Sequence, residues 1–375
     1  EGGRGSAFLS RCCLSGWRKI PPSASSDSSP IQRLAQITNL VQNPLEADFL
    51  LPAQIRMNTY DLIVVGAGPS GLSCAIEAKT QGLSCLVVDK GSVVDAIRRF
   101  PVNLTFFSTP ELLEIGGVPF TASGFRPTRV ECVRYYQMVT RYHQLSVKQE
   151  ERVLRLQRKS DGFEVVTNVS SYSAANVAIA TGYFDHPNPF EVPGADLPKV
   201  VRYYTEPFAY YGRNVAVVGG RNSAVEVALD LFRNGASVTL IHRGSTLSDG
   251  VKYWILPDVE NRITAGDIKA LFETRVREIR PHSILLEGKH DTEIANDVVF
   301  VMIGYRPDTT LLKEAGVNVD DTLQAPVYNH QTMETSVKGI FVAGSIAAGK
   351  LNNKIFIENG RMHGKKIVDA IKNAR

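Results

Sequence analysis

Residues 60–90 read YDLIVVGAGPSGLSCAIEAKTQGLSCLVVDK, and this stretch decides the fold of the chain. The apolar run Leu62–Val65 predicts a strand, and a glycine turn of the form G-x-G-x-x-G follows it. A helix and a second apolar run, Leu83–Val88, complete a strand–turn–helix–strand unit. Such a unit predicts a dinucleotide-binding α/β domain rather than a glycine-rich turn in some other α/β protein.

Each glycine of the turn has a separate physical task. Gly66 permits the turn, Gly68 lets a pyrophosphate approach the backbone, and Gly71 lets the helix pack on the strand. The pyrophosphate would lie on the positive N-terminus of the helix, and Asp89 would accept hydrogen bonds from the ribose hydroxyls. The predicted site in this unit comprises Gly66, Gly68, Pro69, Ser70, Gly71, Asp89 and Lys90.

A second copy of the unit, RNVAVVGGRNSAVEVALDLFRNGASVTLIHR, occupies residues 213–243 and aligns with the first without a gap. Gly219 falls on Gly66, whereas Arg221 takes the place of the middle glycine, a departure from the usual pattern. One chain with two unlike dinucleotide sites has the layout of a flavin reductase.

The ends of the two second strands indicate different dinucleotides. Asp89 suits a free 2′-hydroxyl, whereas His242 and Arg243 suit a 2′-phosphate. We therefore expect FAD on the first copy and NADPH on the second; alternatively, His242 and Arg243 are a solvated pair and Lys252 is a surface lysine. The predicted NADPH site comprises Gly219, Gly220, Arg221, Asn222, Ser223, Ala224, His242, Arg243 and Lys252.

Composition excludes several classes of protein. The 375 residues are 43% hydrophobic and 21% charged, which leaves room for two or three globular domains. A net charge of +4 without a basic run argues against nucleic acid, and no apolar stretch is long enough to span a membrane. Five cysteines without even spacing indicate a reducing compartment, so we expect a cytoplasmic protein. We identify no metal site.

The sequence also predicts the domain organisation. Residues 1–56 include PPSASSDSSP and lack periodicity, so we expect a disordered segment that is either an upstream extension or a targeting or regulatory tail. The remainder is predicted to be α/β, with two Rossmann-like dinucleotide-binding domains, each a three-layer ββα structure. Residues 57–185 and 303–375 would form the FAD domain, and residues 186–302 the NADPH domain inserted into it.

Further segments complete the predicted FAD domain. We expect a helix over Val130–Tyr142, and antiparallel strands over Val147–Gln157 and Phe163–Thr167. The runs VAIATG (177–182) and GIFVAGSIAAG (339–349) each end a strand with small residues that can pack against a cofactor. A last helix starting near residues 354–359 would point its N-terminus at the flavin. These segments add Thr181, Gly182, Gly344, Ser345 and Ile355 to the predicted FAD site.

The region after Lys90 is expected to be loop and short helix lying over the flavin ring. Its candidate pocket residues are Asn103, Thr105, Phe106, Phe107 and Ser108, of which Phe107 is included in the predicted site. The alternative is that the two phenylalanines are simply core residues.

Eight motifs together carry a family resemblance from about Asn58 to the C-terminus. They are GAGPSG (66–71), TFFS (105–108), ATGYFDHPNP (180–189), GGRNSAVEVALDL (219–231), LIHRG (240–244), VKYWILPDVENRI (251–263), AGSIAAGK (343–350) and IFIENGRMHGKK (355–366). With them the chain resembles the thioredoxin-reductase-like flavoproteins, and among these the bacterial bacillithiol-disulfide reductases. The resemblance implies tightly bound FAD, NADPH as the electron donor, and reduction of bacillithiol disulfide to two thiols. We also expect a homo-oligomer, either a dimer or a tetramer.

Two departures from the family affect the predicted substrate. The NADPH domain lacks the C-x-x-C pair of thioredoxin reductases, so thioredoxin is not expected to react by that route. Bacillithiol-disulfide reductases tend to carry cysteine in the glycine turn, where this chain has Ser70, and serine cannot form a mixed disulfide. Cys74, one helical turn further on, is expected to be a buried small side chain. The catalytic residue and the electron acceptor therefore stay open.

Two other functions compete with a disulfide reductase. Gly182, His186 and Phe190 fit part of a flavin monooxygenase fingerprint, but Ala180 replaces its leading phenylalanine and the chain is short for that group. A ferredoxin-NADP reductase-like electron carrier, or an NADPH sensor, is the third interpretation. The ferredoxin type adds an aromatic segment after the last helix, which is not expected here.

Overall fold

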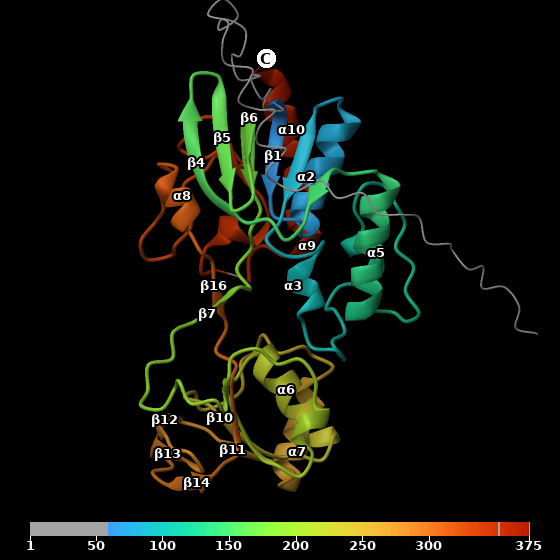
Figure 1. Ribbon diagram of the computed structural model, residues 1–375. Coiled ribbons are helices and arrows are strands. Elements are labelled where there is room, and N and C mark those ends of the chain that lie inside the picture. The colour runs from blue at the N-terminus through green and yellow to red at the C-terminus, as the bar shows by residue number, and fades with distance from the viewer. Residues whose placement is uncertain (1–58, 352, 375) are drawn as a thin grey trace, which may run out of the picture. The chain divides into compact units, whose positions relative to one another are not determined.

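The computed structural model describes residues 59–351 and 353–374. The predictions for residues 1–56 lie outside these ranges. All elements below belong to one compact unit of the chain, and they form two lobes, each built on a parallel sheet (Figure 1).

The first lobe is built on a sheet whose parallel strands run in the order β3-β2-β1-β6-β17. These strands are β1 (Thr59–Val65), β2 (Cys85–Val88), β3 (Val147–Lys148), β6 (Ser171–Ile179) and β17 (Ile340–Val342). Val65 lies opposite both Val88 and Ile179, so three strands end together at one edge. Two antiparallel strands, β4 (Val153–Lys159) and β5 (Gly162–Thr167), extend from the beginning of β6.

Helices α2 (Pro69–Thr80) and α10 (His363–Asn373) pack on each other beside this sheet (Figure 1). Their approach is close, since a Cβ added at Gly364 would lie 2.8 Å from the backbone nitrogen of Cys74. The other elements of the lobe are α3 (Asp95–Arg98), α4 (Pro110–Leu113), α5 (Arg129–Tyr142), α8 (Thr310–Glu314), the 3₁₀ helix η3 (Gly344–Ala348) and α9 (Ile357–Gly360).

The second lobe has its own parallel sheet, in the order β11-β10-β9-β15-β8. The strands are β8 (Val200–Val201), β9 (Asn214–Val218), β10 (Ser237–Ile241), β11 (Ile268–Leu271) and β15 (Val298–Val301), with helices α6 (Asn222–Arg233) and α7 (Leu256–Ala265). An antiparallel sheet accompanies it, formed by β12 (Thr274–Ile279), β13 (Ser283–Gly288) and β14 (Glu293–Ala295).

The second lobe is an insertion in the first. Every strand of its sheets falls between the end of β6 at Ile179 and the start of β17 at Ile340. Its elements run from yellow-green to orange in Figure 1, where the orange α8 belongs to the first lobe. The chain passes between the lobes on two short paired strands, β7 (His186–Pro187) and β16 (Tyr305–Arg306), and a 3₁₀ helix, η2 (Phe208–Tyr210), precedes β9. The predicted α/β fold class and its two repeated strand–helix–strand units are therefore confirmed, while the domain limits at residues 185, 302 and 303 stay predictions.

Two predicted elements differ from the structure. Val147–Gln157 is not one antiparallel strand, because β3 pairs in parallel with β2 and the chain then bends at Glu150, whose φ is +57°. The backbone nitrogen of Glu151 donates to the carbonyl of Asp89, which holds this bend against the end of β2. The last helix is also divided: α9 ends at Gly360 and α10 begins at His363. Among the residues described, no helix is both long and apolar enough to cross a bilayer.

Candidate functional site

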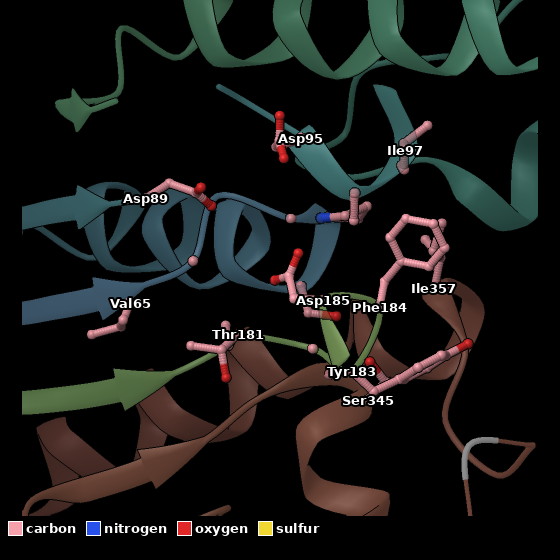
Figure 2. Close-up of a pocket in the computed structure, with 18 of the residues that line it drawn as sticks. Val65, Asp89, Asp95, Ile97, Thr181, Tyr183, Phe184, Asp185, Ser345 and Ile357 are labelled. Carbon is pink, nitrogen blue, oxygen red and sulfur yellow. The ribbon is translucent and has the colours of Figure 1, made fainter. Parts of the chain in front are cut away.

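A cavity of about 400 Å³ lies where β1, β2 and β6 end together. Figure 2 shows Asp89 following β2, Thr181 and Tyr183 following β6, and Ser345 and Ile357 arriving from the C-terminal part of the chain. In open α/β sheets ligands bind outside the carboxyl ends of the strands. The cavity therefore lies where a dinucleotide is expected.

The predicted FAD residues nearly all line this one cavity. The residues brought together there are Gly66, Gly68, Pro69, Ser70, Asp89, Lys90, Phe107, Thr181, Gly182, Gly344, Ser345 and Ile355. Gly71 is the exception, because it packs beneath the turn: an added Cβ would lie 2.0 Å from the carbonyl oxygen of Gly66.

The glycine turn leaves space at the position where a pyrophosphate is expected. Gly66 has φ +114°, and an added Cβ would meet the carbonyl oxygen of Ala180 at 2.5 Å. A Cβ at Gly68 would meet nothing within 4 Å, although Gly68 lines the cavity. Gly68 is also the N-cap of α2, and no side chain caps this helix end. Free space above uncapped N–H groups is what a bound phosphate requires, so the turn fits the predicted group.

Asp89 fixes the turn as well as facing the cavity. Its Oδ2 accepts from the backbone nitrogen of Ala67 at 2.6 Å, and its Oδ1 accepts from Gly91 at 2.7 Å. Burial raises the pKa of Asp89, and these two N–H groups act in the opposite direction. Each carboxylate oxygen has a further lone pair for a ribose hydroxyl. The strand-end acid thus joins the turn to β2, a contact that the sequence pattern did not predict.

A charged cluster in the same cavity was also missed. The ammonium of Lys90 lies 2.8 Å from Asp185, and Arg99 pairs with both Asp185 and Asp95, the latter at 2.7 Å. Arg99 also lies over the ring of Phe184, 5.2 Å from its centroid. Burial alone would raise the pKa of Asp185, but Lys90 and Arg99 hold it below the usual value. The position of Asp185 just after VAIATG was the one sequence signal for this cluster.

Ser70 occupies a narrow place between two glycines. A Cβ added at Gly344 would lie 2.8 Å from its Oγ, and one added at Gly360 would lie 2.7 Å from it. Cys74 and Cys132 are fully buried, as expected for Cys74, and Cys85 is partly buried. Burial raises the pKa of all three thiols, that of Cys85 to about 12. Among the described residues no thiol lines the cavity, and no cluster of metal-ligating side chains is found.

Three of the five candidate pocket residues after Lys90 line the cavity. Phe106, Phe107 and Ser108 line the cavity. Phe106 also packs on the core, but Phe107 is 55% exposed, so the interpretation of both rings as core is wrong for Phe107. Asn103 and Thr105 instead contact the second lobe through Asp230 and Lys252.

The second glycine turn repeats the first with one substitution. Gly219 has φ +147°, and its added Cβ would lie 2.5 Å from the carbonyl oxygen of Met302. A Cβ at Gly220 would lie 2.5 Å from the ring of His242, so this imidazole covers the turn. Arg221 replaces the middle glycine in extended backbone, φ −112° and ψ −174°, which any residue adopts. Its side chain is exposed at the uncapped N-terminus of α6, a suitable place for a cation that meets phosphate.

The remaining predicted NADPH residues differ in their exposure and in their contacts. Arg243 and Ser223 are exposed and Ala224 is buried. Burial, followed by the neighbouring Arg243, lowers the pKa of His242, which favours the neutral ring. The Asn222 side chain is engaged by a loop, since it donates to the carbonyl of Gly250 at 2.7 Å and accepts from the backbone of Lys252 at 2.8 Å.

Lys252 differs from its prediction as a 2′-phosphate ligand. It is only 7% exposed, and its ammonium pairs with Glu226 and donates to the carbonyl of Thr105 at 2.9 Å. A buried ammonium with two acceptors is already neutralised, so it is not presented at the strand end beside Arg243. The alternative expectation, a surface lysine, is wrong because the side chain is buried.

Comparison with known proteins agrees with this arrangement. Residues 63–344 match the family described as pyridine nucleotide-disulphide oxidoreductase. The chain therefore belongs to this family of flavoprotein reductases, and its cofactors are FAD and NADPH. It is 42% identical over 312 residues to bacilliredoxin reductase Bdr of Bacillus subtilis, a match that covers 82% of this chain and 96% of that protein.

Solved structures show the same likeness. Bacillithiol disulfide reductase Bdr from Staphylococcus aureus matches with a TM-score of 0.82 at 39% identity, covering 85% of this chain and 100% of that one. The Bacillus cereus enzyme of the same name gives the same TM-score and identity over 84% of this chain and 100% of that one. Thioredoxin reductase of T. acidophilum, with a TM-score of 0.69 at 20% identity over 84% of this chain and 98% of that one, shares the fold. The chain is a flavin-dependent disulfide reductase by family.

Proposed function

We propose that this enzyme takes hydride from NADPH onto FAD and reduces a low-molecular-weight disulfide of the bacillithiol type. The observation that carries the proposal is likeness, at 39% identity and over the whole length of that chain, to a protein named bacillithiol disulfide reductase. The relative at 42% identity, named bacilliredoxin reductase, supports the same family of reactions. Bound FAD supplies the electron transfer itself, and the protein supplies binding, orientation and exclusion of water.

The residues of the cavity support the proposed FAD binding. The pyrophosphate would lie over Gly68 at the N-terminus of α2, and Asp89 would accept from the ribose. Phe107, Ser345 and Ile355 come from separate parts of the chain and would contact the rest of the flavin. The proposed NADPH site is the second turn, where Arg221 and Arg243 are the exposed cations that would meet phosphates.

Ser70 gives the proposed reaction a particular form. Because no described thiol lines the cavity, the substrate disulfide would be cleaved without a mixed disulfide to residues 59–351 or 353–374. Reduced FAD, when bound, would supply two electrons and one proton, and cleavage of the sulfur–sulfur bond would give one thiol and one thiolate. The thiolate takes its proton from solvent.

A second candidate is transfer to an acceptor that is not a disulfide, and serine at position 70 favours it. A relative named ferredoxin-NADP reductase, from Ignicoccus hospitalis, is 27% identical over 296 residues, 76% of this chain and 90% of that protein. The flavin monooxygenase of Stenotrophomonas maltophilia shares the fold at 23% identity with a TM-score of 0.71, covering 85% of this chain and 99% of that one.

The test is anaerobic reduction with NADPH, followed by mixing with bacillithiol disulfide, glutathione disulfide, a ferredoxin and oxygen in separate runs. Fast reoxidation by bacillithiol disulfide supports the first candidate, and reoxidation by ferredoxin alone supports the second. The matched variants are Ser70→Ala and Ser70→Cys. If the serine takes no covalent part, Ser70→Ala should keep the disulfide rate.

We also propose a cytoplasmic homo-oligomer. The three described cysteines are free thiols, which supports a reducing compartment. Exposed apolar side chains at Val327, Leu351 and Phe356 support association between copies. Light scattering coupled to size-exclusion chromatography would give the mass of the assembly. A monomer at micromolar concentration would contradict the proposed homo-oligomer.

A further inference from the structure

Three contacts join one segment of the first lobe to the second lobe. The backbone nitrogen of Val102 donates to Thr205 at 2.7 Å, and Asn103 donates to Asp230 at 3.2 Å. The third contact is the bond from the Lys252 ammonium to the Thr105 carbonyl. Directly after this carbonyl come Phe106, Phe107 and Ser108, the three residues of the segment that line the flavin cavity.

Lys252 is the buried member of these contacts. Its ammonium has one acceptor on each lobe, the carbonyl of Thr105 and the carboxylate of Glu226, which lies on α6. The Trp254 ring centroid is 5.7 Å from the same nitrogen. Because the pair is largely removed from water, its geometry is held more firmly than that of an exposed ion pair.

The backbone of Lys252 is in turn fixed to the second glycine turn. Its nitrogen donates to Oδ1 of Asn222, the first residue of α6. A hydrogen-bonded path therefore runs from the start of α6, through Lys252, to the carbonyl that precedes Phe106. The outer side of Phe107 is also held from the second lobe, with Trp254 at 5.3 Å between ring centroids.

We propose that Lys252 is a positioning residue, which holds the cavity-lining segment Thr105–Ser108 against the start of α6 and so couples the NADPH turn to the flavin cavity. The inference rests on the proposed function for which cofactor lies at each turn. It assigns Lys252 no contact with either cofactor. A dinucleotide bound at the second turn would shift Asn222 or its loop. Through Lys252 this shift would change the positions of Phe106 and Phe107 beside the flavin.

The test compares Lys252→Met with Lys252→Arg, and with Lys269→Met as the matched control, because Lys269 is an exposed lysine on β11 of the same lobe. The first readout is the visible flavin spectrum as NADP⁺, which cannot reduce FAD, is added. The second is the limiting rate and the apparent Kd of flavin reduction with NADPH and with NADH. The FAD content of each protein is measured first. A protein without bound FAD would contradict the proposed function rather than the role of Lys252.

We expect Lys252→Met to lose the NADP⁺-induced change in the flavin spectrum. Its limiting reduction rate should fall roughly ten- to a hundred-fold with both coenzymes, the effect of misplacing reacting groups by about 1 Å, while the Kd of NADPH stays within about two-fold. Lys252→Arg should recover part of the rate, and Lys269→Met should behave as wild type.

Two results would overturn the proposal. One is a raised Kd for NADPH alone, which would make Lys252 a phosphate ligand after all; the other is an unchanged spectrum and rate. If Lys252→Met does not fold, Glu226→Gln takes its place, since it keeps the shape of the partner and removes its charge. The same pattern at smaller amplitude in Glu226→Gln supports the proposal, and wild-type behaviour contradicts it.

Discussion

Substitution of Gly68 by valine separates cofactor binding from folding. Gly68 has φ −73° and ψ 173°, extended backbone that a β-branched residue adopts readily, and an added Cβ meets nothing within 4 Å. The folded chain should therefore lose only about 1 kcal/mol, the cost of a poorer helix N-cap. The added methyl groups would instead occupy the space in which a pyrophosphate meets the N–H groups of α2.

The size of the binding defect follows from the bonds that are lost. A hydrogen bond to a charged group contributes about 1.5–3 kcal/mol, so loss of two costs about 3–6 kcal/mol, or roughly 10²- to 10⁴-fold in the Kd of FAD. The purified variant should be colourless and should bind added FAD weakly, as measured by quenching of flavin fluorescence. Thermal unfolding of the flavin-free proteins should give nearly the same midpoint.

Two controls accompany this variant. Gly124→Val lies in an exposed loop, where the nearest atom to an added Cβ is 3.8 Å away, and should keep its FAD. Gly71→Ala should instead destabilise the fold, because its Cβ would lie 2.0 Å from the Gly66 carbonyl oxygen. A Gly68→Val protein with one FAD per chain and the wild-type Kd would refute the assignment of the pyrophosphate to this turn.

Three further predictions concern other parts of the chain. Arg243→Ala should weaken NADPH by about ten- to a hundred-fold and leave NADH nearly unchanged, since only the 2′-phosphate pairs with the guanidinium; stopped-flow flavin reduction measures both, and equal losses would contradict it. Burial and then Lys366 lower the pKa of His363 from 6.5 to about 4, and its Nδ1 accepts from Gly344. The unfolded chain then binds a proton that the folded chain does not, so the free energy of unfolding should fall by about 3 kcal/mol as pH drops from 6.5 to 4. In His363→Asn, which keeps an acceptor, the free energy of unfolding measured with urea should change less between pH 6.5 and 4. An unchanged pH dependence would exclude His363. A chain that starts at Met57 should fold, bind FAD and react with NADPH as the full chain does, and insoluble protein would show that residues 1–56 are needed.

The features that the sequence predicted well are local in the chain. A strand, a glycine turn and a helix depend on residues within about 30 positions, and both copies could be recognised from apolar runs and glycine spacing. Twelve of the thirteen predicted FAD residues line one cavity for the same reason, since small residues at the ends of parallel strands meet at one sheet edge. Gly71 does not line the cavity, because its close contact lies beneath the turn, in the packing role expected of the third glycine.

The features that the sequence did not predict depend on distant partners. Arg99 and Asp185 are 86 positions apart, and the motif ATGYFDHPNP that contains Asp185 does not indicate its partner. Lys252 follows a strand end that suits phosphate binding, but its acceptor Thr105 is 147 positions away, so the pattern near Arg243 gave no sign of this contact. The bend at Glu150 is held by Asp89, which a periodicity of alternating residues cannot reveal.

The most direct test of the central claim is the number of thiols produced for each flavin reoxidised. Enzyme reduced anaerobically with one equivalent of NADPH is mixed with bacillithiol disulfide, and the return of the flavin's visible absorbance is followed beside a thiol assay. The proposed function predicts rapid reoxidation with two thiols released per flavin, equally in wild type and Ser70→Ala. Flavin that stays reduced in the presence of the disulfide, but is reoxidised at once by a ferredoxin, would contradict it.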